Sequence, residues 1–191
     1  MPPGETYVTF RDVTSRRARS VRRVESSTTT EELVMSARLN MFDSPVAIKA
    51  WKHIIAANKA IAEGSSLPAA TQELVRIRAS QINGCGACLD MHTKDAAAAG
   101  ETSVRLHMVA AWREATVFTD AERAALELTE QGTRLADGSG VSDEAWAEAV
   151  KHFDDEQLAA LVSQIAVINA FNRGNAITRQ PAGDYRPGQY A

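Results

Sequence analysis

The amino-acid sequence predicts an all-α fold, and three observations carry this prediction. From Thr30 onward, apolar residues recur at helical spacing almost without a break, and residues typical of helix starts precede several of these segments. No stretch of useful length alternates apolar and polar residues as a strand does. The segment that follows Asp154 is apolar over a broad face, as expected of a central or subunit-facing helix.

The first helices are expected between Thr30 and Gly64. Thr30 can cap a helix that begins at Glu31, and Ser44-Pro45 pairs a capping hydroxyl with a proline at the first helical position of the next. The residues assigned to the buried face of this second helix are Val46, Trp51, Ile54, Ile55 and Ile61. Its opposite face carries Lys49, Lys52 and His53, and His53 is interpreted as a solvated surface residue.

Pro68 separates that helix from one that bears Glu73. The pattern predicts that Gln72 and Arg76 are exposed, and the residues expected to pack inward are Leu74, Val75, Ile77 and Ile82. Asn83-Gly84 is a break signal, so a new helix should begin at the cysteine that follows.

The remaining helices are delimited by caps and small residues. Gly100 should end the helix that begins near residue 85, and a short helix over about 103–112 carries His107, a core-edge or surface residue. Thr119-x-x-Glu122 is a capping-box signature, and Ser142 and Asp154 are the caps expected for the last two helices. Prolines and glycines make the tail after about residue 180 non-helical.

Composition places the chain among soluble globular proteins with one domain of ordinary size. Of its 191 residues 45% are hydrophobic and 24% charged, and the net charge of −3 gives no reason to expect nucleic acid or an anionic membrane as partner. No apolar run approaches the roughly 20 residues of a membrane helix. Two cysteines in a single close pair are typical of a reducing compartment, so a cytoplasmic setting is expected.

Residues 1–30 differ from the rest of the chain because arginine and serine crowd together there. Such enrichment is also found in transit peptides and nucleic-acid arms, but acidic residues interrupt it and few aromatic residues accompany it. We interpret residues 1–30 as a flexible, weakly basic extension and residues 31–191 as the domain.

Cys85, Cys88 and His92 are the most informative residues of the sequence. If residues 85–98 form a helix, the three side chains lie on one stripe, because positions three and four apart are neighbours. Free N–H groups at a helix start lower a cysteine pKa from about 8.5, and a nearby histidine adds to this effect. One cysteine can then react as a thiolate, and the other can close a disulfide on its oxidised form. The pattern therefore predicts a dithiol redox centre.

Two alternatives remain open from the residues alone. Cys85, Cys88, His92 and Glu73 could ligate zinc, although structural zinc sites usually draw two pairs of ligands from separate elements and the chain offers no second pair. The cysteines could also be inert core residues beside a solvated histidine. For Glu73, composition favours an exposed residue paired with Arg76.

The spacing of Glu73, Cys85, Cys88 and His92 resembles the signature of the AhpD-like alkylhydroperoxidases of the carboxymuconolactone decarboxylase-like superfamily. The segments that share the resemblance lie within residues 31–187 and include Leu74–Cys85, Asp90–Ala96, Gly100–Thr102, Ala111–Ala115 and Asn169–Arg173. The resemblance implies an AhpD-like helical bundle with the cysteine pair at the N-terminus of a central helix.

The resemblance also implies roles for the residues of the motif. Cys88 is the peroxidatic nucleophile and Cys85 the resolving cysteine, so the two form a disulfide, while His92 and Glu73 relay protons. Some members carry a second histidine between the cysteines, where this chain has Ala87. Because of this departure the expected proton relay has one histidine fewer, which argues against high peroxidase turnover.

The resulting prediction is a cofactor-free, thiol-dependent alkylhydroperoxide reductase. Family members are reduced by lipoyl- or thioredoxin-type proteins, some feed electrons to a peroxiredoxin, and a homo-oligomer, a trimer or dimer of trimers, is expected. A protein disulfide reductase, a redox sensor, a metal-binding module and a ring-opening decarboxylase are the alternatives. The decarboxylase does not need a redox dithiol, so the cysteine pair disfavours it.

Overall fold

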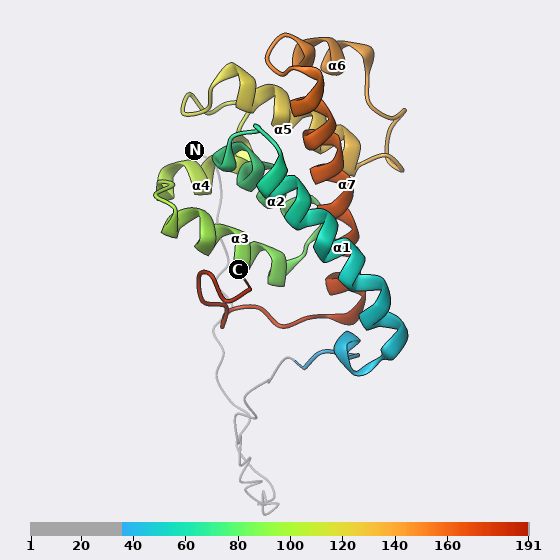
Figure 1. Cartoon of the computed structure of the whole chain (residues 1–191). Helices are drawn as coiled ribbons and strands as arrows, with labels where there is room; N and C mark the ends of the chain where they lie inside the picture. Colours follow the sequence, from blue (N-terminus) through green and yellow to red (C-terminus); the bar gives the residue numbers. More distant parts are fainter. Residues whose placement is uncertain (1–35, 191) are drawn as a thin grey trace, which may run out of the picture. The chain divides into compact units, whose positions relative to one another are not determined.

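The computed structural model describes residues 36–190, in which it contains helices and no strand. The predicted all-α fold is therefore confirmed for this range (Figure 1). The elements are η1 (Met41–Asp43), α1 (Pro45–Gly64), α2 (Ala69–Asn83), α3 (Gly86–Ala98), α4 (Ser103–Met108), η2 (Val109–Ala111), α5 (Asp120–Thr133), α6 (Asp143–Val150) and α7 (Asp155–Thr178). The predicted extension and the helix expected at Glu31 lie outside the described residues.

The helices begin where their capping residues predict. The side chain of Ser44 accepts the backbone N–H of Ala47 at the start of α1, and Ser142 does the same for α6. Thr119 and Glu122 form both hydrogen bonds of a capping box at the start of α5, and Asp154 opens α7 with a second box. These contacts satisfy N–H groups that a helix leaves unpaired at its first turn, so they fix where each helix starts.

Helix α2 lies in the middle of the molecule and packs against α3, α5 and α7 (Figure 1). Its Val75 belongs to a core shared with α5, α6 and α7, whereas Leu74 and Ile77 belong to a second core with α3 and the segment around Trp112. Because α2 contributes to both cores, its polar residues are also drawn inside. The expectation that Gln72 and Arg76 are exposed is wrong, since both are buried.

Helix α1 is less buried than the sequence predicts. Val46 and Ile55 were expected in the core but are 75% and 47% exposed, whereas Trp51, Ile54 and Ile61 are half-buried. Among the described helices α1 packs mainly against α7, so only a narrow stripe of its surface faces the rest of the chain.

Within residues 36–190, no helix is both long and apolar enough to span a membrane.

Replacing Gly174 with alanine should destabilise the protein by about 1–3 kcal/mol. Helices α1 and α7 approach most closely here, and an added Cβ would overlap atoms Cζ2 and Cη2 of Trp51. The Trp51 ring also packs on Phe171, with centroids 5.4 Å apart, which limits its movement. The Tm measured by circular dichroism should fall by roughly 2–12 °C. Gly64→Ala is the control, because its Cβ would meet no atom within 4 Å, and an equal Tm for both variants would contradict this packing argument.

Candidate active site

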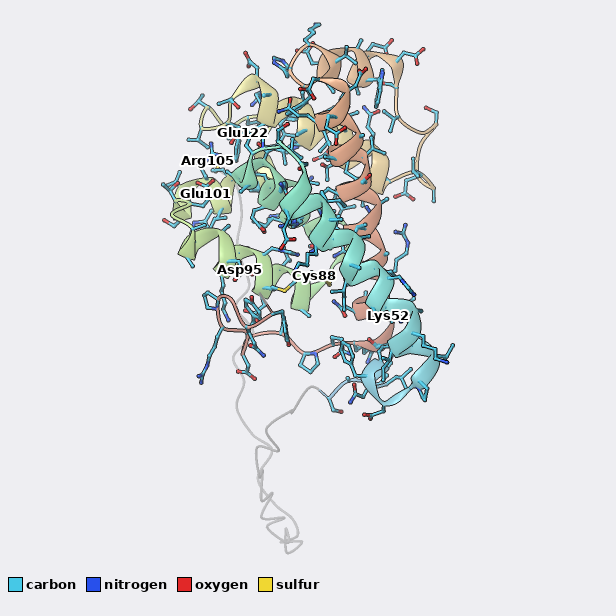
Figure 2. All side chains as sticks on the ribbon, in the orientation of Figure 1. Lys52, Cys88, Asp95, Glu101, Arg105 and Glu122 are labelled. Carbon is cyan, nitrogen blue, oxygen red and sulfur yellow. A yellow bond between two sulfur atoms is a disulfide. The ribbon has the colours of Figure 1, made fainter. Side chains whose placement is uncertain are left out.

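The two cysteines stand at the junction of α2 and α3. Gly84 ends α2 in the left-handed conformation, with φ of 64°, which glycine adopts without strain. Cys85 is the N-cap of α3, and its Sγ accepts the backbone N–H of Cys88 at 3.3 Å. Cys88 is in the first turn, and the two residues form a disulfide with Cα atoms 5.4 Å apart (Figure 2). The predicted position of the pair at a helix start is therefore confirmed.

The chain buries this disulfide, because Cys85 and Cys88 are each 1% exposed. A thiol that reduces the bond has to approach one sulfur directly. Reduction by an external dithiol therefore requires movement of an element that covers the pair.

The structure brings Glu73 of α2 and His92 of α3 together. The carboxylate Oε2 of Glu73 lies 3.0 Å from His92 Nδ1, and His92 is buried one turn after Cys88. Burial works to raise the pKa of Glu73, but the hydrogen bonds and charges of His92 and Arg76 outweigh it and leave this pKa below its ordinary value of 4.5. An ionised carboxylate can only accept, so His92 Nδ1 donates, and Nε2 of the neutral ring is the basic atom.

Arg76 holds the other side of the Glu73 carboxylate. Its Nη1 pairs with Glu73 Oε1, and its Nη2 donates to Gln72 at 3.1 Å and to Gln164 of α7 at 2.8 Å. Arg76 and Glu73 are paired as the composition-based alternative supposed, but Arg76 is buried and Glu73 is half-buried instead of exposed. A buried cation beside Glu73 stabilises its ionised form.

Asn175 of α7 supplies a second contact that the sequence analysis missed. Its side-chain Nδ2 donates to Cys88 Sγ at 3.3 Å, across 87 positions of sequence. In contrast, no hydrogen bond joins His92 to either sulfur within residues 36–190. The broad helical pattern of the last segment predicted α7, but it carried no signal for which asparagine faces the cysteines.

No group of three or more histidine, cysteine or acidic side chains is arranged to hold a metal ion in the described part of the chain. Glu73 and His92 contact each other, but the carboxylate is shared with Arg76, whose positive charge disfavours a bound cation. The arrangement is suited to moving a proton between a carboxylate-oriented imidazole and a reacting group.

Comparison with known proteins supports the resemblance seen in the motif. The model of the carboxymuconolactone decarboxylase family matches residues 49–131, which include all four motif residues. The uncharacterized protein YdfG of Bacillus subtilis is 45% identical over 109 residues, which are 57% of this chain and 74% of YdfG. The chain belongs to the carboxymuconolactone decarboxylase family. The uncharacterized Escherichia coli protein YnjA is 31% identical over 118 residues, 62% of this chain and 64% of YnjA.

Solved structures place the chain on the AhpD-like branch of this family. A protein of unknown function from Agrobacterium tumefaciens, described as a candidate AhpD antioxidant defence protein, has 30% identity and a TM-score of 0.72, over 78% of this chain and all of its own. The debrominase Bmp8, solved with 2,3,4-tribromopyrrole, has 17% identity and a TM-score of 0.66 over 75% of this chain and 74% of its own. At that identity Bmp8 shares the fold alone.

The tail after α7 crosses α3 of this family member on the side that carries Asp90 and Asp95 (Figures 1 and 2). Asp90 accepts the backbone N–H groups of Gly183 at 2.6 Å and of Tyr185 at 3.1 Å. The Tyr185 hydroxyl donates to Asp95 at 2.9 Å, and burial followed by this hydrogen bond and charge raises the pKa of Tyr185 to about 12. The tail is non-helical as predicted, and these contacts fix it against the redox helix.

A group of amide side chains joins α7 to the end of α2, directly before the cysteines. Asn83 donates to Asn169 and to Asn172, each at 2.9 Å, and Asn172 in turn donates to Ser80 at 2.9 Å. Buried amides without partners would be costly, so these bonds favour one arrangement of the two helices. The position of Asn175 relative to Cys88 depends on the same packing of α7.

Proposed function

We propose that this protein is a thiol-dependent hydroperoxide reductase of AhpD type that cycles between a dithiol and the Cys85–Cys88 disulfide. The observation that carries the proposal is the combination of this pair at a helix start with the Glu73–His92 pair one turn further on. The first feature favours a thiolate, and the second provides a base and acid beside it. The antioxidant description of the Agrobacterium relative agrees with this assignment.

In the proposed reaction, His92 Nε2 takes the proton of the Cys88 thiol. The Cys88 thiolate then attacks the terminal oxygen of a hydroperoxide, the O–O bond breaks, and the leaving alkoxide takes a proton to become the alcohol. The sulfenic acid on Cys88 is attacked by the Cys85 sulfur, which forms the disulfide and releases water. An external dithiol reduces the disulfide by exchange, so one hydroperoxide and one dithiol yield an alcohol, water and a disulfide.

Glu73 serves this sequence by holding His92. Because Nδ1 is occupied by the carboxylate, the ring presents Nε2 in one orientation, and the ion pair stabilises the imidazolium that forms when the proton is taken. Ala87, where some family members have a histidine, is half-buried and provides no second base. We therefore propose that proton transfer depends on His92 alone.

Peroxide consumption by the purified protein, supplied with either a lipoyl-type or a thioredoxin-type dithiol, tests the proposal. Catalytic loss of an alkyl hydroperoxide with one of these reductants is the expected result. Consumption of one equivalent of hydroperoxide per chain, with no further turnover in the presence of reductant, would favour a redox sensor. Dithiol oxidation by a protein disulfide but not by hydroperoxide would favour a disulfide reductase. If hydroperoxide leaves both thiols unchanged, the proposal is wrong.

We further propose a reducing, cytoplasmic setting and a homo-oligomer, either a trimer or a dimer of trimers. Large apolar side chains remain exposed on α1, α6 and α7 of the single chain, including Val46, Ile55, Trp146 and Val162. Exposed apolar groups of this kind are typical of surfaces that another subunit covers. Light scattering at micromolar concentration should give a mass of three or six chains of 20.6 kDa, and a monomer would contradict the proposal.

A further inference from the structure

Asn175 is placed to act on one sulfur of the pair and not on the other. Its Nδ2 lies 3.3 Å from Cys88 Sγ, whereas Cys85 Sγ accepts the backbone N–H of Cys88. We propose that the Asn175 side-chain amide stabilises the thiolate of Cys88 and thereby makes Cys88, not Cys85, the attacking sulfur. The inference deepens the proposed function and rests on it for the identity of the reaction, but the contact can be tested without hydroperoxide.

The chemistry of the contact changes when the disulfide opens. A disulfide sulfur is a weak acceptor, but a thiolate is an anion, and hydrogen bonds to charged acceptors are about twice as strong as neutral ones. A donor that binds the charged form more strongly than the neutral form favours ionisation. Asn175 has no charge and no proton to exchange at neutral pH, so its effect is stabilisation and not proton transfer.

The backbone around Asn175 holds its side chain in position. Its own carbonyl accepts the N–H of Gln180 at 2.9 Å, in the turn that Arg179 closes in the left-handed conformation. The preceding residue, Gly174, lies directly against the Trp51 ring of α1. A donor on so well supported a helix end loses little freedom when it binds the sulfur.

The charged groups around the pair have other partners. Glu73 and His92 bind each other, and Asp90 of α3 binds Lys94 and the tail. Arg179 is exposed at the end of α7. Among residues 36–190, no charged side chain forms a hydrogen bond or ion pair with either sulfur. The two local donors to sulfur are thus a backbone N–H for Cys85, which side-chain substitutions retain, and the Asn175 amide for Cys88.

The test uses two reduced single-cysteine proteins, Cys85→Ser and Cys88→Ser, each with Asn175 and with Asn175→Leu. Leucine has a similar shape but no N–H group. Alkylation by iodoacetamide is followed across pH, and far-UV circular dichroism checks the fold. In the protein that retains Cys88, Asn175→Leu should raise the midpoint pH by about one, which slows alkylation about tenfold below the midpoint. In the protein that retains Cys85, the same substitution should leave the midpoint unchanged.

Asn175→Asp provides a second variant of nearly the same size if leucine disturbs packing. Its carboxylate should raise the Cys88 midpoint further than leucine does, because it adds a negative charge beside the thiolate. An unchanged Cys88 midpoint in a folded variant, or an equal shift for both cysteines, would overturn the inference. If the midpoint pH shifts for Cys88 alone but the parent protein consumes no hydroperoxide, the role of Asn175 is supported and the proposed peroxide reaction is wrong.

Discussion

Cys88→Ser should abolish the reaction of the reduced protein with hydroperoxide, whereas Cys85→Ser should react once and stop. Cys88 lies four residues before His92, and Cys85 lies seven before it, so the imidazole is one turn from the first sulfur and two from the second. The start of α3 favours ionisation of Cys85 instead. The effect of the helix start on Cys85 and the effect of His92 on Cys88 are each on the order of one kcal/mol. The hydrogen bond that Asn175 donates to Cys88 Sγ also favours ionisation of Cys88.

The single turnover of Cys85→Ser leaves a sulfenic acid that has no partner cysteine. Dimedone should label Cys88 in this variant, and excess hydroperoxide should carry the sulfur on to the sulfinic acid. Intact mass measurement distinguishes these adducts from the unmodified chain. Dimedone labelling of Cys85 in the Cys88→Ser protein would reverse the assignment and show that the helix start outweighs His92 and Asn175.

Arg76→Met should cost about 3–5 kcal/mol of stability, because it removes the buried guanidinium that pairs with the half-buried Glu73 carboxylate. The Tm is expected to fall by roughly 6–20 °C. The peroxide reaction of the folded variant should fall as well, since Glu73 then ionises less readily and orients His92 less firmly. A loss of up to about 100-fold is in the range of general acid–base effects.

The pH dependence of this loss follows from the lowered pKa of Glu73. A carboxylate with a lowered folded-state pKa contributes stability above its unfolded value near 4.5, and the contribution is lost as the pH falls through the folded value. The difference in unfolding free energy between parent and Arg76→Met should therefore be largest at neutral pH and shrink below about pH 4.5. Denaturant titrations at several pH values measure it, and a constant difference across pH would contradict the argument.

Arg78→Met is the matched control for Arg76→Met. Arg78 lies two residues further along α2 and pairs with Glu130 at 2.5 Å, but Glu130 also binds Arg113 and Trp112 and so keeps a cation when Arg78 is lost. The control should be less destabilised and should retain the peroxide rate. Equal losses of rate in the two variants would mean that Arg76 acts through stability alone.

The sequence predicted the helix boundaries well because local residues determine them. Ser44, Thr119 and Asp154 cap helices through contacts within three positions, and Gly84 turns the chain before Cys85 without help from distant residues. Local spacing also placed Cys88 and His92 on one stripe of a helix. The pairing of Glu73 with His92, 19 positions apart, came only from the family resemblance.

Contacts between distant segments could not be predicted from local pattern. Arg76 appeared exposed because its charge usually seeks water, but Gln164, 88 positions away, accepts a hydrogen bond from its Nη2 and so lowers the cost of burying it. Asn175 approaches Cys88 only after α7 has packed on α2 and α3. Val46 was assigned to the core because its spacing fits an apolar stripe, and that spacing does not reveal that α1 has few neighbours in the described chain.

Cys85 gives α3 a feature that no other described helix has. The side-chain caps of α1, α4, α5, α6 and α7 are oxygen atoms, whereas the side-chain atom that accepts the N–H of Cys88 in the first turn of α3 is a sulfur that gains and loses a bond in each proposed cycle. Formation or reduction of the disulfide therefore changes the hydrogen-bond acceptor of the Cys88 backbone N–H. The amide resonance of Cys88 in a nuclear magnetic resonance spectrum would report which fraction of the protein is oxidised.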